Sequence, residues 1–229
     1  MKILTCGDSW SRGEWDCNDQ GHGVTHNGIN DYFQNSGYQI HNIHRFSNKQ
    51  SISELKKYLL TESPDVILYF FTDPFRDLVD LKNPSRFIDF EYLAKDINSF
   101  VNLHQKLLNK SLKELDKIGK KIYILGGCQR LTKQKYKNIE ILIESISELV
   151  CPEYTHPLYW DSGWSSFLKF ESVNFNRKFF DLVEANHKLQ WSMETDEFAE
   201  MFRPDGLHPN RHAHYKLYDF LKKNLNELK

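Results

Sequence analysis

A series of short apolar runs, separated by helical stretches, constrains the fold of this chain more than any other feature. The run DVILYFF, Asp65–Phe71, is continuous and rich in β-branched and aromatic residues, which is typical of a strand buried on both faces. KKIYILGG, Lys120–Gly127, is of the same kind and ends in two glycines. Lys2–Cys6 and Tyr38–Phe46 predict two further strands, and Leu189–Met193 a weaker fifth. The sequence thus predicts a sheet of about five strands.

Helical patterns lie between these strands. Ser51–Leu60 begins with a capping box, Ser51-x-x-Glu54. Asp96–Gly119 carries apolar residues three or four positions apart and stops at a glycine, and His208–Lys229 predicts another amphipathic helix. Four residues of this last helix are expected to face the core: Tyr215, Leu217, Tyr218 and Leu221. Because strands and helices alternate, we expect an α/β protein, a flavodoxin-like three-layer α/β/α sandwich around a parallel sheet.

The length and composition suit one domain, with 229 residues of which 40% are hydrophobic and 14% aromatic. We therefore expect a single domain over residues 1–229. Residues 128–172 fit the alternating pattern least, because a predicted helix, Lys137–Leu149, is followed by a stretch rich in Pro, Trp and Tyr without periodicity. This region is predicted to be an insertion or lid-like loop over one end of the sheet.

The charge of the chain is nearly balanced. Its 30 Lys and Arg residues against 31 Asp and Glu residues give a formal net charge of -1, so no overall field attracts nucleic acid or anionic lipid. Lysines gather at Lys120–Lys121 and Lys133–Lys137, where we expect a solvated face. The sequence thus predicts neither a nucleic-acid partner nor a membrane partner, and nothing in it indicates an oligomeric state.

The cysteines and the first residues favour a reducing compartment. Cys6, Cys17, Cys128 and Cys151 show neither C-x-x-C spacing nor the density of a disulfide scaffold, and Cys6 is expected to be a small buried residue. Only three residues separate MKIL from Asp8, which leaves no room for the apolar region of a signal peptide. The longest apolar stretch, within DVILYFF, is far shorter than the roughly 20 residues of a membrane span. We therefore expect a cytoplasmic protein.

Two short motifs stand near the two ends of the chain. The letters GDSW place Ser9 directly after the first predicted strand, and the letters DGLH place Asp205 and His208 just before the last predicted helix. In open parallel sheets, ligands bind outside the carboxyl ends of the strands. A serine hydroxyl becomes a nucleophile when a base takes its proton, and that base needs an orienting acid. A loop that holds both acid and base therefore indicates nucleophilic catalysis.

GDSWSRG and DGLHPN together resemble the motifs of the SGNH, or GDSL, hydrolase family, which places its serine motif after the first strand and an Asp-x-x-His motif before the last helix. Size, order of elements and motif positions match over nearly the whole chain. The resemblance implies that Ser9 is the nucleophile, His208 the general base and then acid, and Asp205 the residue that orients the imidazole. It also implies that Asp8 supports the turn and that no cofactor is needed.

The chain departs from this family where the oxyanion hole is expected. The family usually places a glycine after the second strand, where this chain reads SNK, and an asparagine after the third, where it has Thr72. Asn48, the middle residue of SNK, is expected to stand in because asparagine tolerates left-handed backbone angles, so that its N–H can donate. A threonine hydroxyl can donate one hydrogen bond. The predicted hole therefore consists of Ser9, Asn48 and Thr72.

Three further residues are candidates for binding substrate: Arg12, Arg76 and Trp160. Arg76 either binds an anionic group of the substrate or forms a loop-ordering pair with Asp73 or Asp77. The same choice between a substrate contact and a structural role applies to Arg12. Trp160 either stacks on a sugar or acyl group or belongs to the core.

Histidines at the start of the last helix raise the question of a metal site. His208 and His212 are four residues apart and can share a helix face, with His214 close by. No glutamate completes an H-E-x-x-H pattern and no further ligand is evident, so we expect no metal.

Two classes of function follow from these observations. The first is a serine hydrolase that cleaves an ester, either an O-acetyl or acyl ester of a carbohydrate or a small acyl ester, through a Ser9-His208-Asp205 triad and an acyl-enzyme intermediate. Transfer of the acyl group to an alcohol is a close variant. The second class, motivated by the altered oxyanion hole, is a catalytically impaired relative that binds an acylated or carbohydrate ligand. A nucleotide-binding protein is disfavoured, because the chain has no Gly-rich phosphate loop.

Overall fold

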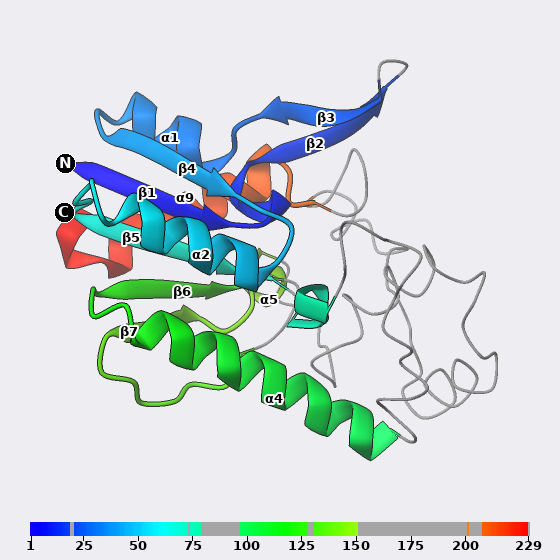
Figure 1. Cartoon of the computed structure of the whole chain (residues 1–229). Helices are drawn as coiled ribbons and strands as arrows, with labels where there is room; N and C mark the ends of the chain where they lie inside the picture. The colour runs from blue at the N-terminus through cyan, green and yellow to red at the C-terminus, as the bar shows by residue number, and fades with distance from the viewer. Residues whose placement is uncertain are drawn as a thin grey trace.

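A five-stranded parallel sheet forms the centre of the computed structural model (Figure 1). Its strands, in chain order, are β1 Lys2–Gly7, β4 Gln39–His44, β5 Val66–Phe71, β6 Ile122–Gly126 and β7 Ile139–Ile143. They lie side by side in the order β4-β1-β5-β6-β7, so that the first strand lies between the second and the third, as in flavodoxin-like folds. The structure describes residues 1–18, 21–72, 74–78, 97–127, 131–150, 201 and 208–228.

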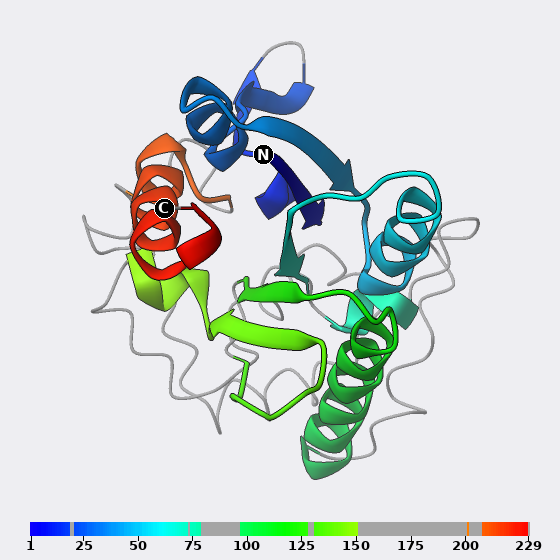
Figure 2. The ribbon, with the colours of Figure 1, turned by 90° about the vertical axis from the view of Figure 1, so that its left-hand side faces the viewer.

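Helices cover both faces of this sheet. In the described ranges the helices are α1 Ile29–Asn35, α2 Asn48–Tyr58, α4 Ile97–Asp116, α5 Ile146–Val150 and α9 Arg211–Asn224. The same ranges hold three 3-10 turns: η1 Ser9–Ser11, η2 Pro74–Leu78 and η3 Asn226–Leu228. Figure 2 shows α1, α5 and α9 on one side of the strands and α2 and α4 on the other. The predicted three-layer α/β/α sandwich is therefore confirmed.

Two hydrophobic cores, one on each face, hold the layers together. The six residues of β5 are all at most 3% exposed and divide between the cores, because successive side chains of a strand point to opposite faces. The core under α1, α5 and α9 takes Val66, Leu68 and Phe70, and the core under α2 and α4 takes Ile67, Tyr69 and Phe71. The prediction that DVILYFF is buried on both faces is confirmed.

The fifth strand, β7, lies where a helix was predicted. Its isoleucines at positions 139, 141 and 143 are buried while Glu140 is exposed, which is the two-residue period of a strand with one covered face. Helical structure begins only at α5, so the predicted helix Lys137–Leu149 is wrong over most of its length. The strand predicted at Leu189–Met193 lies outside the described residues, as do residues 151–172 of the predicted insertion.

An antiparallel hairpin, β2 Glu14–Asn18 and β3 Gly21–His26, follows the first strand and was not predicted. Its sequence, EWDCN and GHGVTH, lacks the alternation of apolar and polar residues by which a strand is recognised. The register of the two strands shifts between Glu14 and Trp15. Figure 1 shows the hairpin at the edge of the sheet where β1 ends, which places it beside the candidate site.

Helix α2 begins at Asn48, three residues before the start of the predicted helix. Its N-cap is Ser47, whose Oγ accepts a hydrogen bond from the Gln50 N–H at 3.4 Å. Ser51 lies inside the helix, and its hydroxyl donates to the Gly7 carbonyl at 3.1 Å. The predicted capping box is therefore wrong, and the true helix start brings Asn48 to the carboxyl edge of the sheet.

Helix α9 begins at Arg211, behind Asn210, whose side chain accepts hydrogen bonds from the N–H groups of the first turn. Leu217 and Leu221 are buried, as predicted. Tyr218 is half-buried against the same core. Tyr215 is 55% exposed, so its predicted core position is wrong.

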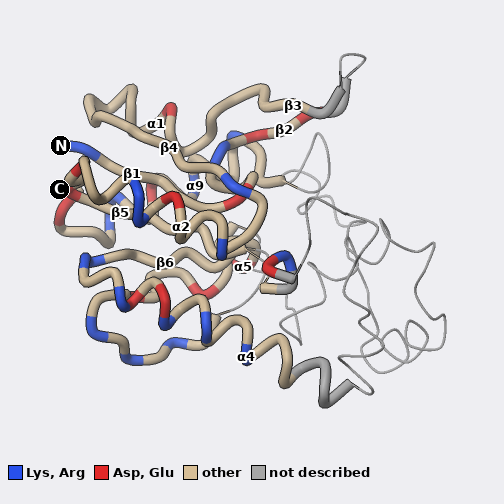
Figure 3. Tube along the Cα trace, in the orientation of Figure 1, with Lys and Arg blue, Asp and Glu red and all other residues tan. Residues whose placement is uncertain are grey.

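Surface lysines lie where a solvated face was predicted. Lys120, Lys121, Lys133, Lys135 and Lys137 are all exposed. Figure 3 shows basic residues along the loop that leads into β7, at one edge of the sheet. Within the described part of the chain, no helix is both long and apolar enough to cross a membrane.

The cysteine prediction is tested at one position. Cys6 is fully buried in β1 and is not in a disulfide. Burial raises the pKa of its thiol, which therefore stays protonated. Cys6 is thus a small core residue, as predicted.

Candidate active site

The turn that carries Ser9 leaves β1 through a glycine that no other residue can replace without strain. Gly7 has φ +152°, and a Cβ at this position would lie 2.4 Å from the Phe70 carbonyl oxygen of the neighbouring strand. Asp8 caps the following 3-10 turn by accepting a hydrogen bond from the Trp10 N–H at 3.0 Å. Gly13 likewise has φ +139°, with its Cβ position 2.1 Å from the His26 carbonyl oxygen. Both glycines supply the backbone freedom that this turn requires.

A polar network under the turn fixes its far end. Asn30 and Asn42 each donate an amide hydrogen bond to the Ser11 carbonyl, at 2.9 and 3.0 Å. Thr5 of β1 joins the two, because its hydroxyl donates to Asn30 at 2.7 Å and accepts from Asn42 at 2.8 Å. Satisfied polar networks of this kind rigidify the segments they connect. Sequence reasoning missed all three side chains, because single Asn and Thr residues carry no recognisable pattern.

The structure brings together one residue from each of the two sequence motifs, Ser9 and His208. The Ser9 hydroxyl oxygen lies 2.7 Å from Nε2 of His208, across 199 positions of sequence. Both side chains are partly accessible. A hydroxyl in hydrogen-bond contact with an imidazole nitrogen is the arrangement in which the imidazole can accept the hydroxyl proton. Asp205, the predicted orienting acid, lies outside the described residues.

Trp15 of β2 contacts both members of this pair. Its ring stacks on the His208 imidazole, with centroids 5.2 Å apart and planes at 28°. Its Nε1–H donates to the Ser9 carbonyl at 3.0 Å. The guanidinium of Arg12 lies 5.7 Å from the centroid of the Trp15 ring, in cation–π contact. Sequence reasoning missed Trp15, whose one signal is an aromatic residue six positions after the candidate nucleophile.

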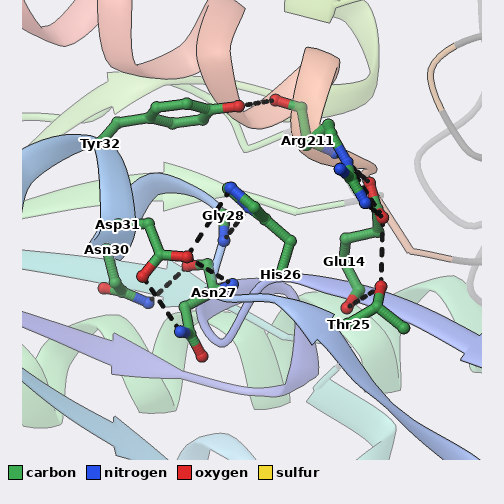
Figure 4. Close-up of polar contacts among 9 residues, drawn as sticks. All are labelled: Glu14, Thr25, His26, Asn27, Gly28, Asn30, Asp31, Tyr32 and Arg211. Atoms are coloured by element: carbon green, nitrogen blue, oxygen red, sulfur yellow. Dashed lines mark hydrogen bonds and ion pairs between the residues drawn. The ribbon is translucent and has the colours of Figure 1, made fainter. Parts of the chain in front are cut away.

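Glu14, the residue before Trp15, ties the hairpin to the start of α9 (Figure 4). Its carboxylate accepts hydrogen bonds from the Arg211 backbone N–H at 2.6 Å and from the guanidinium at 2.7 and 3.1 Å. Burial alone would raise the pKa of Glu14, but the hydrogen bonds from Arg211 outweigh it and lower the pKa to about 2. Glu14 is therefore ionised at neutral pH, and it anchors the residue that stands three positions after His208.

His44, at the end of β4, lies at the same edge of the sheet. Its ring centroid is 6.1 Å from that of Trp15. Burial lowers the pKa of His44, and the charge of Arg12 acts in the same direction. The imidazole is therefore neutral at neutral pH. No sequence pattern singled out this histidine.

Arg76 pairs with Asp8, a carboxylate that was not among its predicted partners. Its guanidinium lies 3.3 Å from Oδ2 of Asp8. Asp77 instead accepts hydrogen bonds from the Lys49 N–H at 2.6 Å and from the Ser111 hydroxyl at 3.1 Å. Asp73, the other predicted partner, lies outside the described residues. The predicted structural role of Arg76 thus has a physical basis, but it orders the turn that carries Ser9.

Asn48 and Thr72, the predicted partners of Ser9 in an oxyanion hole, lie in direct contact. Asn48 is the first residue of α2, so the left-handed conformation predicted for it is wrong. Its side chain is fully buried and holds the Thr72 backbone, accepting from the N–H at 3.2 Å and donating to the carbonyl at 2.8 Å. Among the described residues, the Asn48 N–H, the Ser9 N–H and the Thr72 hydroxyl donate to no other group.

The remaining candidate residues divide between exposed, buried and undescribed positions. Arg12 is exposed next to Trp15, and Trp160 lies outside the described residues. His214 is fully buried, with its ring 2.6 Å from where a Cβ on Gly28 would stand. Burial lowers the pKa of His214 to about 4, so it is a neutral core residue. The described residues hold no group of three or more His, Cys, Asp and Glu side chains that could bind a metal ion.

Comparisons with known proteins give matches among solved structures. No protein-family model matches the chain. No curated protein matches it in sequence. TesA is similar with a TM-score of 0.45 and 17% identity, over 100% of this chain and 100% of that one.

Two further solved structures are similar at the same level. Axe2, an acetylxylan esterase from Geobacillus stearothermophilus, has a TM-score of 0.43 and 12% identity over 100% of this chain and 96% of that one. A member of the lipolytic protein G-D-S-L family from Veillonella parvula DSM 2008 has a TM-score of 0.42 and 14% identity over 98% of both chains. Likenesses of this size carry no inference about activity. The fold rests on the strand order and layers described above, and the candidate site on its own geometry.

Proposed function

We propose that this chain is a serine ester hydrolase of the SGNH type, with Ser9 as nucleophile, His208 as general base and acid, and Asp205 as the orienting acid. One observation carries the proposal: the 2.7 Å contact between the Ser9 hydroxyl and the His208 imidazole. The proposed substrate is an O-acetyl or acyl ester of a carbohydrate, or a small acyl ester. No step requires a cofactor.

In the proposed reaction, Nε2 of His208 takes the hydroxyl proton while Oγ of Ser9 bonds to the acyl carbon. The tetrahedral intermediate collapses as the bond to the alcohol oxygen breaks, and the alcohol leaves with the proton from His208. Water then gives a proton to His208 and attacks the acyl carbon. Ser9 leaves with that proton, and the carboxylic acid is released.

The oxyanion that forms in each half of the reaction needs donors. The Ser9 N–H, the Asn48 N–H and the Thr72 hydroxyl are the proposed ones, because the Asn48 amide and the Thr72 N–H are bonded to each other. Loss of one such donor typically costs about 100- to 1000-fold in rate. The alternative proposal is a catalytically impaired relative that binds an acylated or carbohydrate ligand. It is supported by the Asn48 side-chain amide, which is bonded to the Thr72 backbone and so is not available to an oxyanion.

Hydrolysis of p-nitrophenyl acetate and p-nitrophenyl butyrate tests the proposal. We expect the purified chain to release p-nitrophenol above the uncatalysed rate and the Ser9→Ala variant to do so only at background. Ser11→Ala serves as the matched control: it removes the neighbouring hydroxyl, which donates to the Asp8 carbonyl at 2.7 Å, and should retain turnover. Equal rates for the wild type and Ser9→Ala would contradict the hydrolase proposal and favour the alternative, a catalytically impaired protein that binds its ligand.

A further inference from the structure

Trp15 is placed to hold both reacting side chains at once. The stacked ring covers one face of the His208 imidazole, and the indole N–H fixes the carbonyl of Ser9. Trp10, by comparison, is 8% exposed and belongs to the hydrophobic core. Trp15 is half-buried at the site, and its indole N–H has a partner in the Ser9 carbonyl. A buried tryptophan usually pairs its N–H in this way while the rest of its ring makes apolar contacts.

Trp15 and its neighbour Glu14 both reach the segment at the start of α9. Glu14 binds Arg211, and Trp15 stacks on His208. The register of the hairpin shifts at this pair, where Thr25 of β3 is the extra residue. Bulges of this kind are common next to active sites. One strand thus ties the His208 segment to the Ser9 turn.

We propose that Trp15 is a positioning residue of the reaction, which holds the His208 imidazole in the plane and at the distance from which it takes the Ser9 proton; this inference rests on the proposed hydrolase function. The hydrogen bond with Ser9 acts on one ring nitrogen of the imidazole. The Trp15 ring stacked on the face of the imidazole restricts its rotation about the side-chain bonds. The bond to the Ser9 carbonyl keeps the nucleophile's main chain at a fixed distance from the same indole.

The test measures kcat and KM on p-nitrophenyl acetate for Trp15→Leu and Trp15→Phe. We expect Trp15→Leu to lower kcat by about 100-fold, the cost of a displacement near 1 Å, with KM unchanged. Trp15→Phe keeps a stacking ring but loses the N–H. Its kcat should fall by about tenfold at most, which corresponds to the loss of one neutral hydrogen bond. Tyr215→Leu is the matched control, because this exposed ring packs against Tyr32 and Tyr218 of the same face and should leave kcat unchanged.

The outcomes separate this inference from the function on which it rests. A wild-type chain without turnover contradicts the hydrolase proposal itself. A wild type that turns over while Trp15→Leu matches its kcat overturns the positioning role, as does a Trp15→Phe variant that is as slow as Trp15→Leu. A raised KM at constant kcat would make Trp15 a substrate contact instead. If Trp15→Leu does not fold, Trp15→Met takes its place, because it fills a similar space without an aromatic face.

Discussion

At the scale of single residues, the site depends on a few side chains with separable tasks. Ser9 and His208 face each other, while Asn48 holds the Thr72 backbone by both of its polar groups. Ser9, His208 and Thr72 could be named from the sequence because their motifs and strand ends are local. The stacking of Trp15 could not, because it depends on a contact between residues 193 positions apart (208 minus 15).

Thr72 is the residue on which the strength of the proposed oxyanion hole depends. Thr72→Ala removes the hydroxyl but leaves the backbone bonds to Asn48, so the fold is retained. We expect kcat on p-nitrophenyl acetate to fall by about 100-fold or more, as for the loss of one oxyanion donor. Thr72→Ser keeps the hydroxyl and should stay near the wild type. Unchanged turnover in Thr72→Ala would show that this hydroxyl does not stabilise the oxyanion.

At the scale of elements, the sequence predicted four of the five strands of the sheet but not the parts that complete the site. Long apolar runs bounded by glycine or proline identified β5 and β6, because strands buried on both faces need such runs. β7 was read as a helix because isoleucine and glutamate occur in both elements within so short a segment. The hairpin was missed because its strands are held by Glu14, Trp15 and their distant partners, and not by an apolar pattern.

The ion pair between the hairpin and α9 makes a prediction about pH. Glu14 has its pKa lowered from 4.5 to about 2 in the folded chain, so its ionised form stabilises the fold above pH 4.5, and this contribution is lost as the pH falls toward 2. Glu14→Gln should lower the free energy of unfolding at pH 7 by about 1–3 kcal/mol. The difference from the wild type, measured by urea denaturation, should shrink between pH 4.5 and 2.

Glu54→Gln is the control for this measurement. Glu54 pairs with Lys57 on the surface of α2, and exposed pairs contribute about 1 kcal/mol or less. The Glu54→Gln substitution should therefore change the free energy of unfolding little at any pH. The opposite result is a free energy of unfolding that differs between Glu14→Gln and the wild type by the same amount at every pH. That result would contradict a Glu14 carboxylate whose pKa is lowered by Arg211.

At the scale of the whole molecule, the strand order decides where the site lies. In a sheet of this order, ligands bind outside the carboxyl ends of the strands where the connections change direction, between β1 and β5. Ser9 follows β1 and Thr72 follows β5, so both stand at this point. Helix α9 packs beside α1 on one face of the sheet. This packing places His208, just before α9, next to the segment that follows β1. The alternation of strands and helices in the sequence was sufficient to predict this architecture.

Labelling by a fluorophosphonate probe, located by mass spectrometry, shows whether Ser9 is an activated nucleophile. Such a probe bonds to a serine only when a base takes the hydroxyl proton and the site stabilises a developing oxyanion. We expect one modified residue, Ser9, in the wild type, with labelling abolished in Ser9→Ala and in His208→Ala. A folded wild-type chain that carries no label at Ser9, or a His208→Ala variant that labels at the wild-type rate, would contradict this expectation.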